Sequence, residues 1–224
     1  MDAMPEARTL RVDAERNRRR LLDAALELFS ERGLDVGVGE IAARAGVGRG
    51  TLFRNFASKE DLIAAIVGER MREAAASGRE LLDAPDPEEA LFEFLQQMVG
   101  QQQSDRALFD AVHDTFLANS EIAAAYAELV GVIEQLVARA QAAGVVRADL
   151  GALDLIVMVK GLCEAATALH HVNPHIAERQ LDLVRAALRP AAATEPLRGR
   201  PPTIDDFKRA FPAPGAAAGA AKAS

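Results

Sequence analysis

The sequence has few aromatic residues, no tryptophan and a single cysteine. Aromatic residues make up 4% of the 224 residues, and the one cysteine, Cys163, excludes an internal disulfide bond and is typical of a reducing compartment. Runs of Val, Ile, Thr and aromatic residues, which indicate β-strands, are missing. Alanine and leucine dominate the apolar half of the chain, and both favour helices. The composition therefore predicts an all-α fold.

Long apolar runs are also absent from the sequence. The longest run, from Leu155 to Val159, ends at Lys160 and is far shorter than the roughly 20 residues that a membrane-spanning helix needs. Residues 1–11 contain no apolar segment of the kind found in secretory signals. We therefore expect a cytoplasmic protein that has no membrane partner.

The net charge of −7 is distributed unevenly along the chain. Residues 1–70 carry 12 basic and 12 acidic side chains, whereas residues 71–190 carry 9 basic and 18 acidic ones. The acidity therefore lies in the C-terminal part, where it would keep that part away from a phosphate backbone. The net charge alone neither supports nor excludes nucleic-acid binding, so the local placement of basic residues has to decide.

Helical periodicity and turn residues divide the chain into four parts. Apolar residues at helical spacing predict helices over 13–32, 38–45, 49–56, 58–82, 87–103, 106–118, 120–143, 149–171 and 175–189. Ser58 is expected to cap the fourth helix, and Pro85 and Pro87 are expected to end it. We expect a flexible arm over 1–12, a three-helix domain over 13–65, a C-terminal helical bundle over 66–190, and a flexible Ala/Pro/Gly-rich tail over 191–224. Within this tail, only residues 204–211 are expected to be ordered.

The helix that begins at Arg49 has the pattern of a DNA-recognition helix. At about 100° per residue, Leu52 and Phe56 fall together and point into the domain. The outward side then carries Arg49, Gly50, Thr51, Phe53, Arg54 and Asn55. Arg and Asn can form paired hydrogen bonds to guanine and adenine, and a Thr methyl or a Phe edge can contact a thymine methyl. Gly50 would let the helix backbone approach a duplex closely.

Basic residues around this helix are expected to contact phosphates. Lys59 lies in the first turn of the next helix, whose free N–H groups also favour an anion. Arg44 and a cluster of N-terminal arginines, which are Arg16, Arg18, Arg19 and Arg20, could add contacts to the DNA backbone. Such contacts supply affinity and salt dependence but little sequence information.

The run IAARAGVGRGTLFRNFASKEDLI, residues 41–63, resembles the DNA-binding region of the tetracycline-repressor (TetR) family, whose usual pattern is I-A-x-x-A-G-V-S-x-G-T-L-Y-x-x-F-x-S-K-E-x-L. The resemblance implies a homodimer with a helix-turn-helix domain, a palindromic double-stranded DNA operator and a small-molecule effector in the C-terminal domain. It places the base and phosphate contacts on Arg49, Gly50, Thr51, Phe53, Asn55 and Lys59. Three residues depart from the pattern: Phe53 replaces the usual Tyr, while Gly48 and Gly37 replace helix-capping Ser or Thr.

The C-terminal domain offers a candidate ligand pocket and a candidate dimer interface. The pocket candidates are Phe92, Met98, Phe109, His113, Phe116, Tyr126, Met158 and Cys163, which suit a largely apolar effector but are equally explained as ordinary core. Small residues on the helix over 149–171 allow another helix to approach closely. The interface candidates are Leu153, Val157, Gly161, Ala165, Ala168, Leu181, Val184 and Leu188.

Other functions find little support in the sequence. The glycines of residues 46–51 follow no strand and precede no Gly-Lys-Ser/Thr, so they do not predict a nucleotide-binding loop. His170, His171 and His175, with Cys163 and Glu164, match no firm metal-ligand spacing, and no catalytic motif is present. We predict a ligand-responsive DNA-binding regulator, a repressor that its effector releases from the operator, with no cofactor, no metal and no enzymatic activity. The alternative is a helical small-molecule sensor or enzyme that does not bind DNA.

Overall fold

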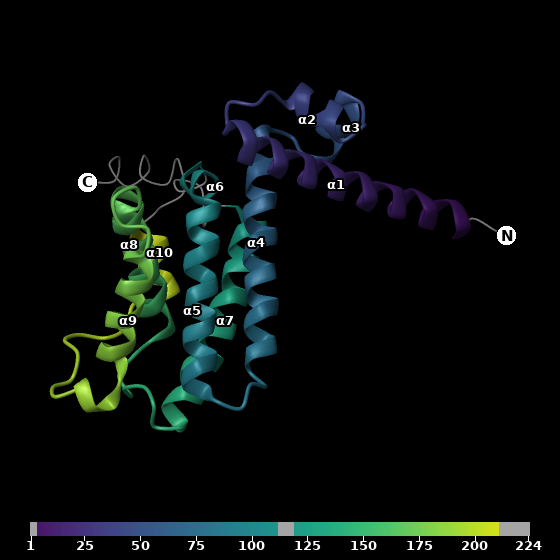
Figure 1. Ribbon diagram of the computed structural model, residues 1–224. Helices are drawn as coiled ribbons and strands as arrows, with labels where there is room; N and C mark the ends of the chain where they lie inside the picture. The colour runs from purple at the N-terminus through teal and green to yellow at the C-terminus, as the bar shows by residue number, and fades with distance from the viewer. Residues whose placement is uncertain (1–3, 112–118, 211–224) are drawn as a thin grey trace, which may run out of the picture. The chain divides into compact units, whose positions relative to one another are not determined.

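The computed structural model describes residues 4–111 and 119–210, and all of the regular structure in these residues is helical (Figure 1). The elements are α1 (Met4–Arg32), α2 (Val38–Arg44), α3 (Arg49–Asn55), α4 (Lys59–Leu81), α5 (Pro87–Ser104), α6 (Arg106–Ala111), α7 (Ser120–Ala142), α8 (Ala152–Leu169), α9 (Ile176–Leu188), the 3-10 turn η2 (Pro190–Ala192) and α10 (Ile204–Ala210). The predicted all-α fold is confirmed. The chain forms two compact units, one within residues 1–67 and 107–113 and the other within residues 68–106 and 114–224.

Side-chain caps set several of the helix boundaries. At the start of α4, the Ser58 hydroxyl accepts a hydrogen bond of 3.0 Å from the N–H of Asp61, as the capping pattern predicts. At the start of α5, the Asp86 carboxylate accepts two hydrogen bonds, of 2.8 and 3.2 Å, from N–H groups of the first turn. Pro87 occupies the first position of α5, where no N–H is needed. Gly33 follows α1 with a φ of 73°, a left-handed conformation that glycine adopts without strain.

Both ends of the chain differ from the sequence prediction. Residues 4–12, which we expected to form a flexible arm, are the first turns of α1. Ala, Glu, Arg and Leu in this segment favour helix, and they extend a helix that is already nucleated downstream. Residues 191–203, which we expected in a flexible tail, make specific contacts in the second unit, and α10 forms within the segment 204–211 that we expected to be ordered. Residues 211–224 lie outside the described part of the chain.

The first unit has its core where α1, α2 and α3 meet. Leu21 of α1, Ile41 of α2 and Leu52 of α3 are fully buried, and Phe56 at the end of α3 is 3% exposed. Burying such side chains stabilises the unit by about 1.5–3 kcal/mol each. The inward side of α3 is therefore fixed by packing, which determines the side that faces solvent.

The second unit is a helical bundle centred on α5, which packs against α7, α8 and α9. Leu91, Phe94 and Leu95 of α5 are buried at the centre. Gly78 lets α4 approach closely, because a Cβ at this position would lie 2.6 Å from Val132 and 2.8 Å from Phe94. Within the described residues, none of the helices is long and apolar enough to cross a membrane.

Candidate nucleic-acid interface

The outward side of α3 lies on the surface of the first unit. Phe53 is 51% exposed, whereas its neighbour Leu52 is fully buried. Arg49, Gly50 and Arg54 are also exposed, while Thr51 and Asn55 are half-buried. The exposed Phe53 ring lies between exposed arginines in the sequence of α3, so apolar and cationic groups are offered by the same short helix. The predicted recognition residues are therefore on one accessible surface, which we call the α3 face: Arg49, Gly50, Thr51, Phe53, Arg54 and Asn55.

Hydrogen bonds within α3 organise the polar side chains of the α3 face. The Arg54 guanidinium donates from Nε to the Gly50 carbonyl (3.1 Å) and from Nη2 to the Thr51 hydroxyl (3.2 Å). The Asn55 amide donates from Nδ2 to the Thr51 carbonyl (2.8 Å). A guanidinium has five N–H donors, so Arg54 keeps donors beyond these two. The side chains are thus held along the helix and can still donate to a ligand.

Two glycines near the α3 face differ in what occupies the space beside them. A Cβ at Gly39 would lie 2.2 Å from Nη2 of Arg49, so Gly39 makes room for that guanidinium. A Cβ at Gly50 would meet no described heavy atom within 4 Å. Glycine within a helix costs roughly 0.5–1 kcal/mol relative to alanine. Packing against the described residues therefore does not require glycine at position 50. A molecule that binds close to the backbone of α3 would explain why this residue is glycine.

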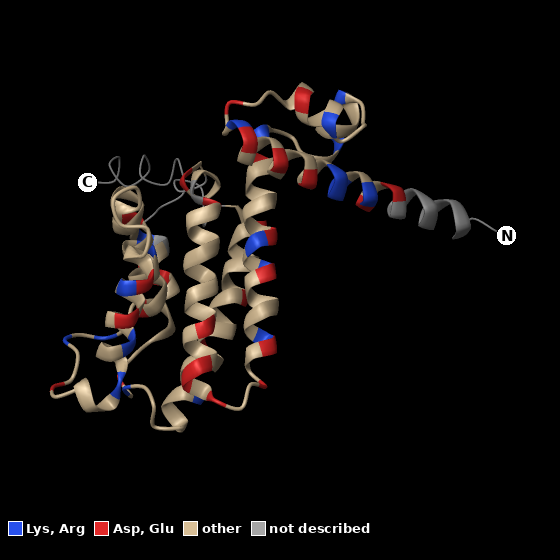
Figure 2. Cartoon of the chain, viewed as in Figure 1, with Lys and Arg blue, Asp and Glu red and all other residues tan. Residues whose placement is uncertain are grey.

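Helix α3 is basic without any acidic residue of its own. This helix carries two arginines and no acidic residue, whereas α1 carries both signs (Figure 2). Two of the N-terminal arginines contact side chains of the same unit. Arg18 lies 4.7 Å above the Phe56 ring and Arg19 pairs with Asp23 at 3.1 Å. The Arg18 contact joins α1 to the end of α3, whereas the Arg19 ion pair lies within α1.

Lys59 and Arg44, which we predict to contact phosphates, each interact with other residues of the first unit. Nζ of Lys59 donates to the carbonyl of Leu34 and lies 5.8 Å from the centre of the Phe29 ring. Arg44 pairs with Glu31 (3.2 Å) and with a second glutamate of α1, and hydrogen bonds to these carboxylates raise its pKa. An ammonium has three donors, so Lys59 retains two for an anion. The charge of Arg44 is balanced by two carboxylates, which weakens the prediction that it contacts phosphate.

The predicted pocket residues differ in burial and in the unit to which they belong. Phe92, Tyr126 and Cys163 are buried in the second unit, and Met98 and Met158 are half-buried. Phe109 belongs to the first unit, and His113 and Phe116 lie outside the described residues. A pocket of about 250 Å³ between α4 and α5 contains Met98, and its other lining residues are Glu73, Ala74, Ser77, Phe94, Gln97 and Gln101.

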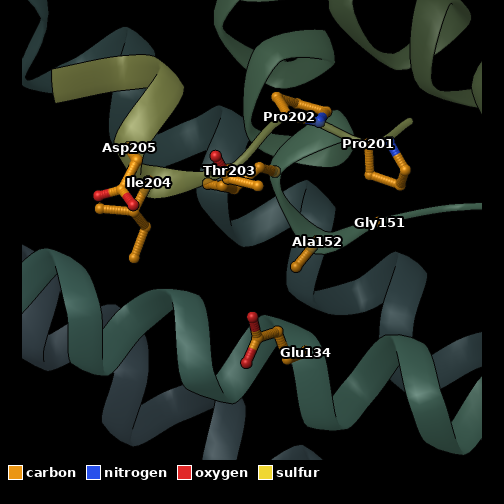
Figure 3. A pocket seen from close by; sticks show the side chains of 9 residues that line it. Glu134, Gly151, Ala152, Pro201, Pro202, Thr203, Ile204 and Asp205 are labelled. Atoms are coloured by element: carbon orange, nitrogen blue, oxygen red, sulfur yellow. The ribbon is translucent and has the colours of Figure 1, made fainter. Parts of the chain in front are cut away.

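An open groove of about 510 Å³ lies elsewhere in the second unit (Figure 3). It is lined by Glu134 of α7, residues 151–153 at the start of α8 and residues 201–205. These lining residues, all in the described part of the chain, include none of the pocket candidates.

Burial keeps Tyr126 and Cys163 neutral. It raises the pKa of Tyr126 to about 12 and that of Cys163 to about 11. The Cys163 thiol donates to the Val99 carbonyl at 3.8 Å. A buried, protonated thiol is a poor nucleophile and a poor metal ligand. No group of three or more His, Cys, Asp or Glu side chains in the described residues is placed to hold a metal ion.

The predicted interface residues on α8 and α9 are partly exposed and partly buried within the subunit. Leu153, Leu181 and Leu188 are 6%, 6% and 4% exposed, so they belong to the core of the subunit and we remove them from the interface. Val184 is half-buried. The interface candidates exposed on α8 are Val157, Gly161, Ala165 and Ala168, and the charged residues Lys160 and Glu164 are exposed on the same helix. Leu169 of α8 and Leu183 of α9, which the sequence analysis does not name, are 46% and 54% exposed.

Comparisons with known proteins match both units. Residues 21–66 match a family model described as bacterial regulatory proteins of the tetR family, and residues 86–190 match the C-terminal domain of SbtR-like transcriptional regulators. The HTH-type transcriptional regulator AcrR of Shigella flexneri is 43% identical over 61 residues, which are 27% of this chain and 28% of that protein. The chain thus spans less than a third of the length of the curated relatives that it matches.

Solved structures are similar over a larger share of the chain. A TetR transcription regulatory protein from Mycobacterium vanbaalenii is 35% identical, with a TM-score of 0.61, over 80% of this chain and 99% of that one. The TetR transcriptional regulator SCO0520 from Streptomyces coelicolor is 31% identical, with a TM-score of 0.60, over 78% of this chain and 99% of that one. These likenesses cover parts of both units.

Proposed function

The chain belongs to the TetR family of bacterial transcriptional regulators, and from this premise we propose that it is a homodimeric, ligand-responsive regulator that binds a palindromic DNA operator through the α3 face. It acts in the cytoplasm as a repressor that a small molecule releases from DNA, and not as an enzyme. Two recognition helices related by two-fold symmetry would read half-sites about 34–36 Å apart, or a multiple of that distance. An effector in the second unit would act by favouring one spacing over another.

The exposed Phe53 beside the open space at Gly50 is the observation that carries this proposal. Both residues cost stability if their only neighbour is water: Phe53 leaves apolar surface exposed, and Gly50 weakens a short helix. A DNA major groove accounts for both, because it accepts a helix at close range and offers thymine methyl groups to an aromatic edge.

Homodimerisation is supported by the apolar surface of α8 and α9. Val157, Gly161, Ala165 and Ala168 are spaced by three or four residues and therefore share one side of α8. A Cβ at Gly161 would meet no described heavy atom within 4 Å, as at Gly50. A second copy of the chain packed on this surface would cover Val157 and Leu183 and would use the close approach that Gly161 allows.

DNA binding by the purified protein tests the proposal. Fluorescence anisotropy with duplex DNA from upstream of the protein's own gene should show tight binding that weakens as salt rises. Thr51→Ala should weaken binding through a lost base contact. Lys59→Ala should weaken it through a lost phosphate contact and reduce the salt slope by about 1. Arg198→Ala, which removes an exposed arginine outside α3, α8 and α9, should have no effect.

Thermal unfolding of each variant separates lost binding from lost folding, because Lys59 also holds the Leu34 carbonyl. If the folded Thr51 and Lys59 variants bind as tightly as the wild type, the α3 face is not the DNA-binding surface. If the wild type shows no salt-sensitive binding to any duplex, a helical sensor that does not bind DNA becomes the better proposal.

A further inference from the structure

Helix α1 begins well before the segment that matches the family's DNA-binding model. The helix starts at Met4, whereas the matching model starts at residue 21. The apolar side chains that α1 buries in the first unit also begin there, with Leu21 and Leu22. Residues 13–20, which we call the α1 extension, are all exposed or half-buried. Packing inside the subunit therefore does not explain the composition of the α1 extension.

The α1 extension is rich in arginine. Four of its eight residues are arginines and two are acidic. The part of α1 that follows has the opposite balance, because residues 21–32 hold three acidic residues and one arginine. The α1 extension therefore offers positive charge on a part of the helix that the core of the unit does not cover.

The arginines of the first unit divide into two sets by their partners. Arg32 pairs with a glutamate of α2, and Arg44 pairs with two glutamates of α1. Among the residues that the structure describes, Arg16, Arg20 and Arg49 have no ion-pair or hydrogen-bond partner. The charges of these three guanidinium groups are therefore available to an anion from outside the subunit.

The α1 extension lies beside α3. A Cβ at Gly46, in the turn that leads into α3, would be only 2.6 Å from Nη2 of Arg20. Arg18 lies over the ring of Phe56, the residue that follows α3. Arg16 is one helical turn before Arg20 and shares its side of α1. Helix α1 thus contacts both ends of α3 and then continues past it towards the N-terminus (Figure 1).

We propose that the α1 extension is a second DNA contact, in which Arg16 and Arg20 bind phosphates of the strand that passes the start of α3. This inference rests on the proposed function, because it takes the α3 face as the surface that reads base pairs. A guanidinium binds phosphate through paired N–H donors, and such contacts supply affinity and salt dependence but no base preference. The structure thereby selects two members of the N-terminal arginine cluster, since Arg18 and Arg19 already contact side chains of the first unit.

The salt dependence of operator binding tests this contact in the full-length protein. The double variant Arg16→Gln/Arg20→Gln keeps residues that favour helix. It should reduce the slope of log K against log salt by about 2, which is about 1 for each lost phosphate contact. Its affinity should be below that of the wild type at low salt and approach it as salt rises. Arg79→Gln/Arg198→Gln, which removes two exposed arginines of the second unit, is the matched control and should keep the wild-type slope.

Two further measurements separate a phosphate contact from a structural role. Arg16→Lys/Arg20→Lys keeps both charges and should keep most of the wild-type slope, because lysine also binds phosphate. Hydroxyl-radical footprinting should show backbone positions that the wild type protects and the glutamine variant leaves exposed. The base sequence that each protein selects should stay the same.

Three results would each overturn the proposal: a glutamine variant with the wild-type salt slope, a lysine variant that behaves like the glutamine variant, or identical footprints. If the wild type binds DNA and Thr51→Ala weakens this binding while one of these results is found, only the role of the α1 extension is wrong. If the wild type shows no salt-sensitive binding to any duplex, the proposed function fails together with this inference.

Discussion

Replacing Gly50 with alanine should make the protein more stable and a poorer DNA binder. A Cβ at this position meets no described heavy atom within 4 Å, so the methyl group introduces no clash inside the subunit. Alanine in place of a helical glycine stabilises by roughly 0.5–1 kcal/mol, and the lower end applies here because Gly50 is the second residue of α3. Urea unfolding at one fixed protein concentration measures this gain, since the stability of a dimer depends on concentration.

The same methyl group should obstruct a duplex that lies against the α3 face. Forcing an extra methyl group into a close-packed contact costs about 1–3 kcal/mol, which is roughly a 5- to 150-fold loss of operator affinity by anisotropy. Gly100→Ala is the matched control, because Gly100 is an exposed helical glycine of α5 whose Cβ also meets nothing described within 4 Å. It should stabilise without changing affinity. A Gly50→Ala variant that is more stable and binds DNA with wild-type affinity would show that no duplex lies close against α3 at this position.

Further predictions follow from the same contacts. Phe53→Tyr adds a hydroxyl to an exposed ring and should tighten operator binding about 2- to 10-fold through a hydrogen bond to phosphate; unchanged affinity in anisotropy would show that the ring edge does not reach the DNA backbone. Val157→Glu places a charge in the proposed interface and should shift the dimer towards monomer in light scattering; a variant as dimeric as the wild type would move the interface elsewhere. A hydrogen bond from Arg147 is the main cause that holds the pKa of Asp149 below its ordinary value. The ionised Asp149 therefore stabilises the folded protein at pH values above its unfolded pKa of about 3.9, and this stabilisation is lost as the pH falls below that value. Asp149 also accepts a hydrogen bond of 2.7 Å from the N–H of Leu197, and further along the same segment the Phe207 ring lies 6.4 Å from that of Tyr126, measured between centroids. The fluorescence of Tyr126, the one tyrosine of the chain, should therefore report release of residues 193–210 in acid, and Asp149→Asn should release them at neutral pH too; a signal that does not change with pH in the wild type would contradict this.

Local patterns predicted the helices and the α3 face because both depend on neighbours in sequence. The spacing of Leu52 and Phe56 determines which side of α3 is buried, and the structure confirms it. Capping by Ser58 was predictable for the same reason, since its partner is three residues away.

Contacts between distant residues could not be read from periodicity. Helix α8 has apolar residues on several sides, so the sequence did not show that Leu153 is buried while Val157 is exposed. The partner of Lys59, the Leu34 carbonyl, is a backbone atom in a loop 25 residues away. Residues 191–203 show the same limit: their composition predicts flexibility, but Asp149 and Leu197, separated by 48 positions, form a contact that anchors them.

Selection from a random duplex library tests most directly whether the α3 face reads base pairs. The wild type should enrich a two-fold symmetric sequence. Thr51→Ala should lose base preference at one symmetric pair of positions and keep it elsewhere, whereas Lys59→Ala should select the same sequence with lower affinity. If Thr51→Ala enriches the wild-type sequence unchanged, or if the wild type enriches no sequence, α3 is not a recognition helix.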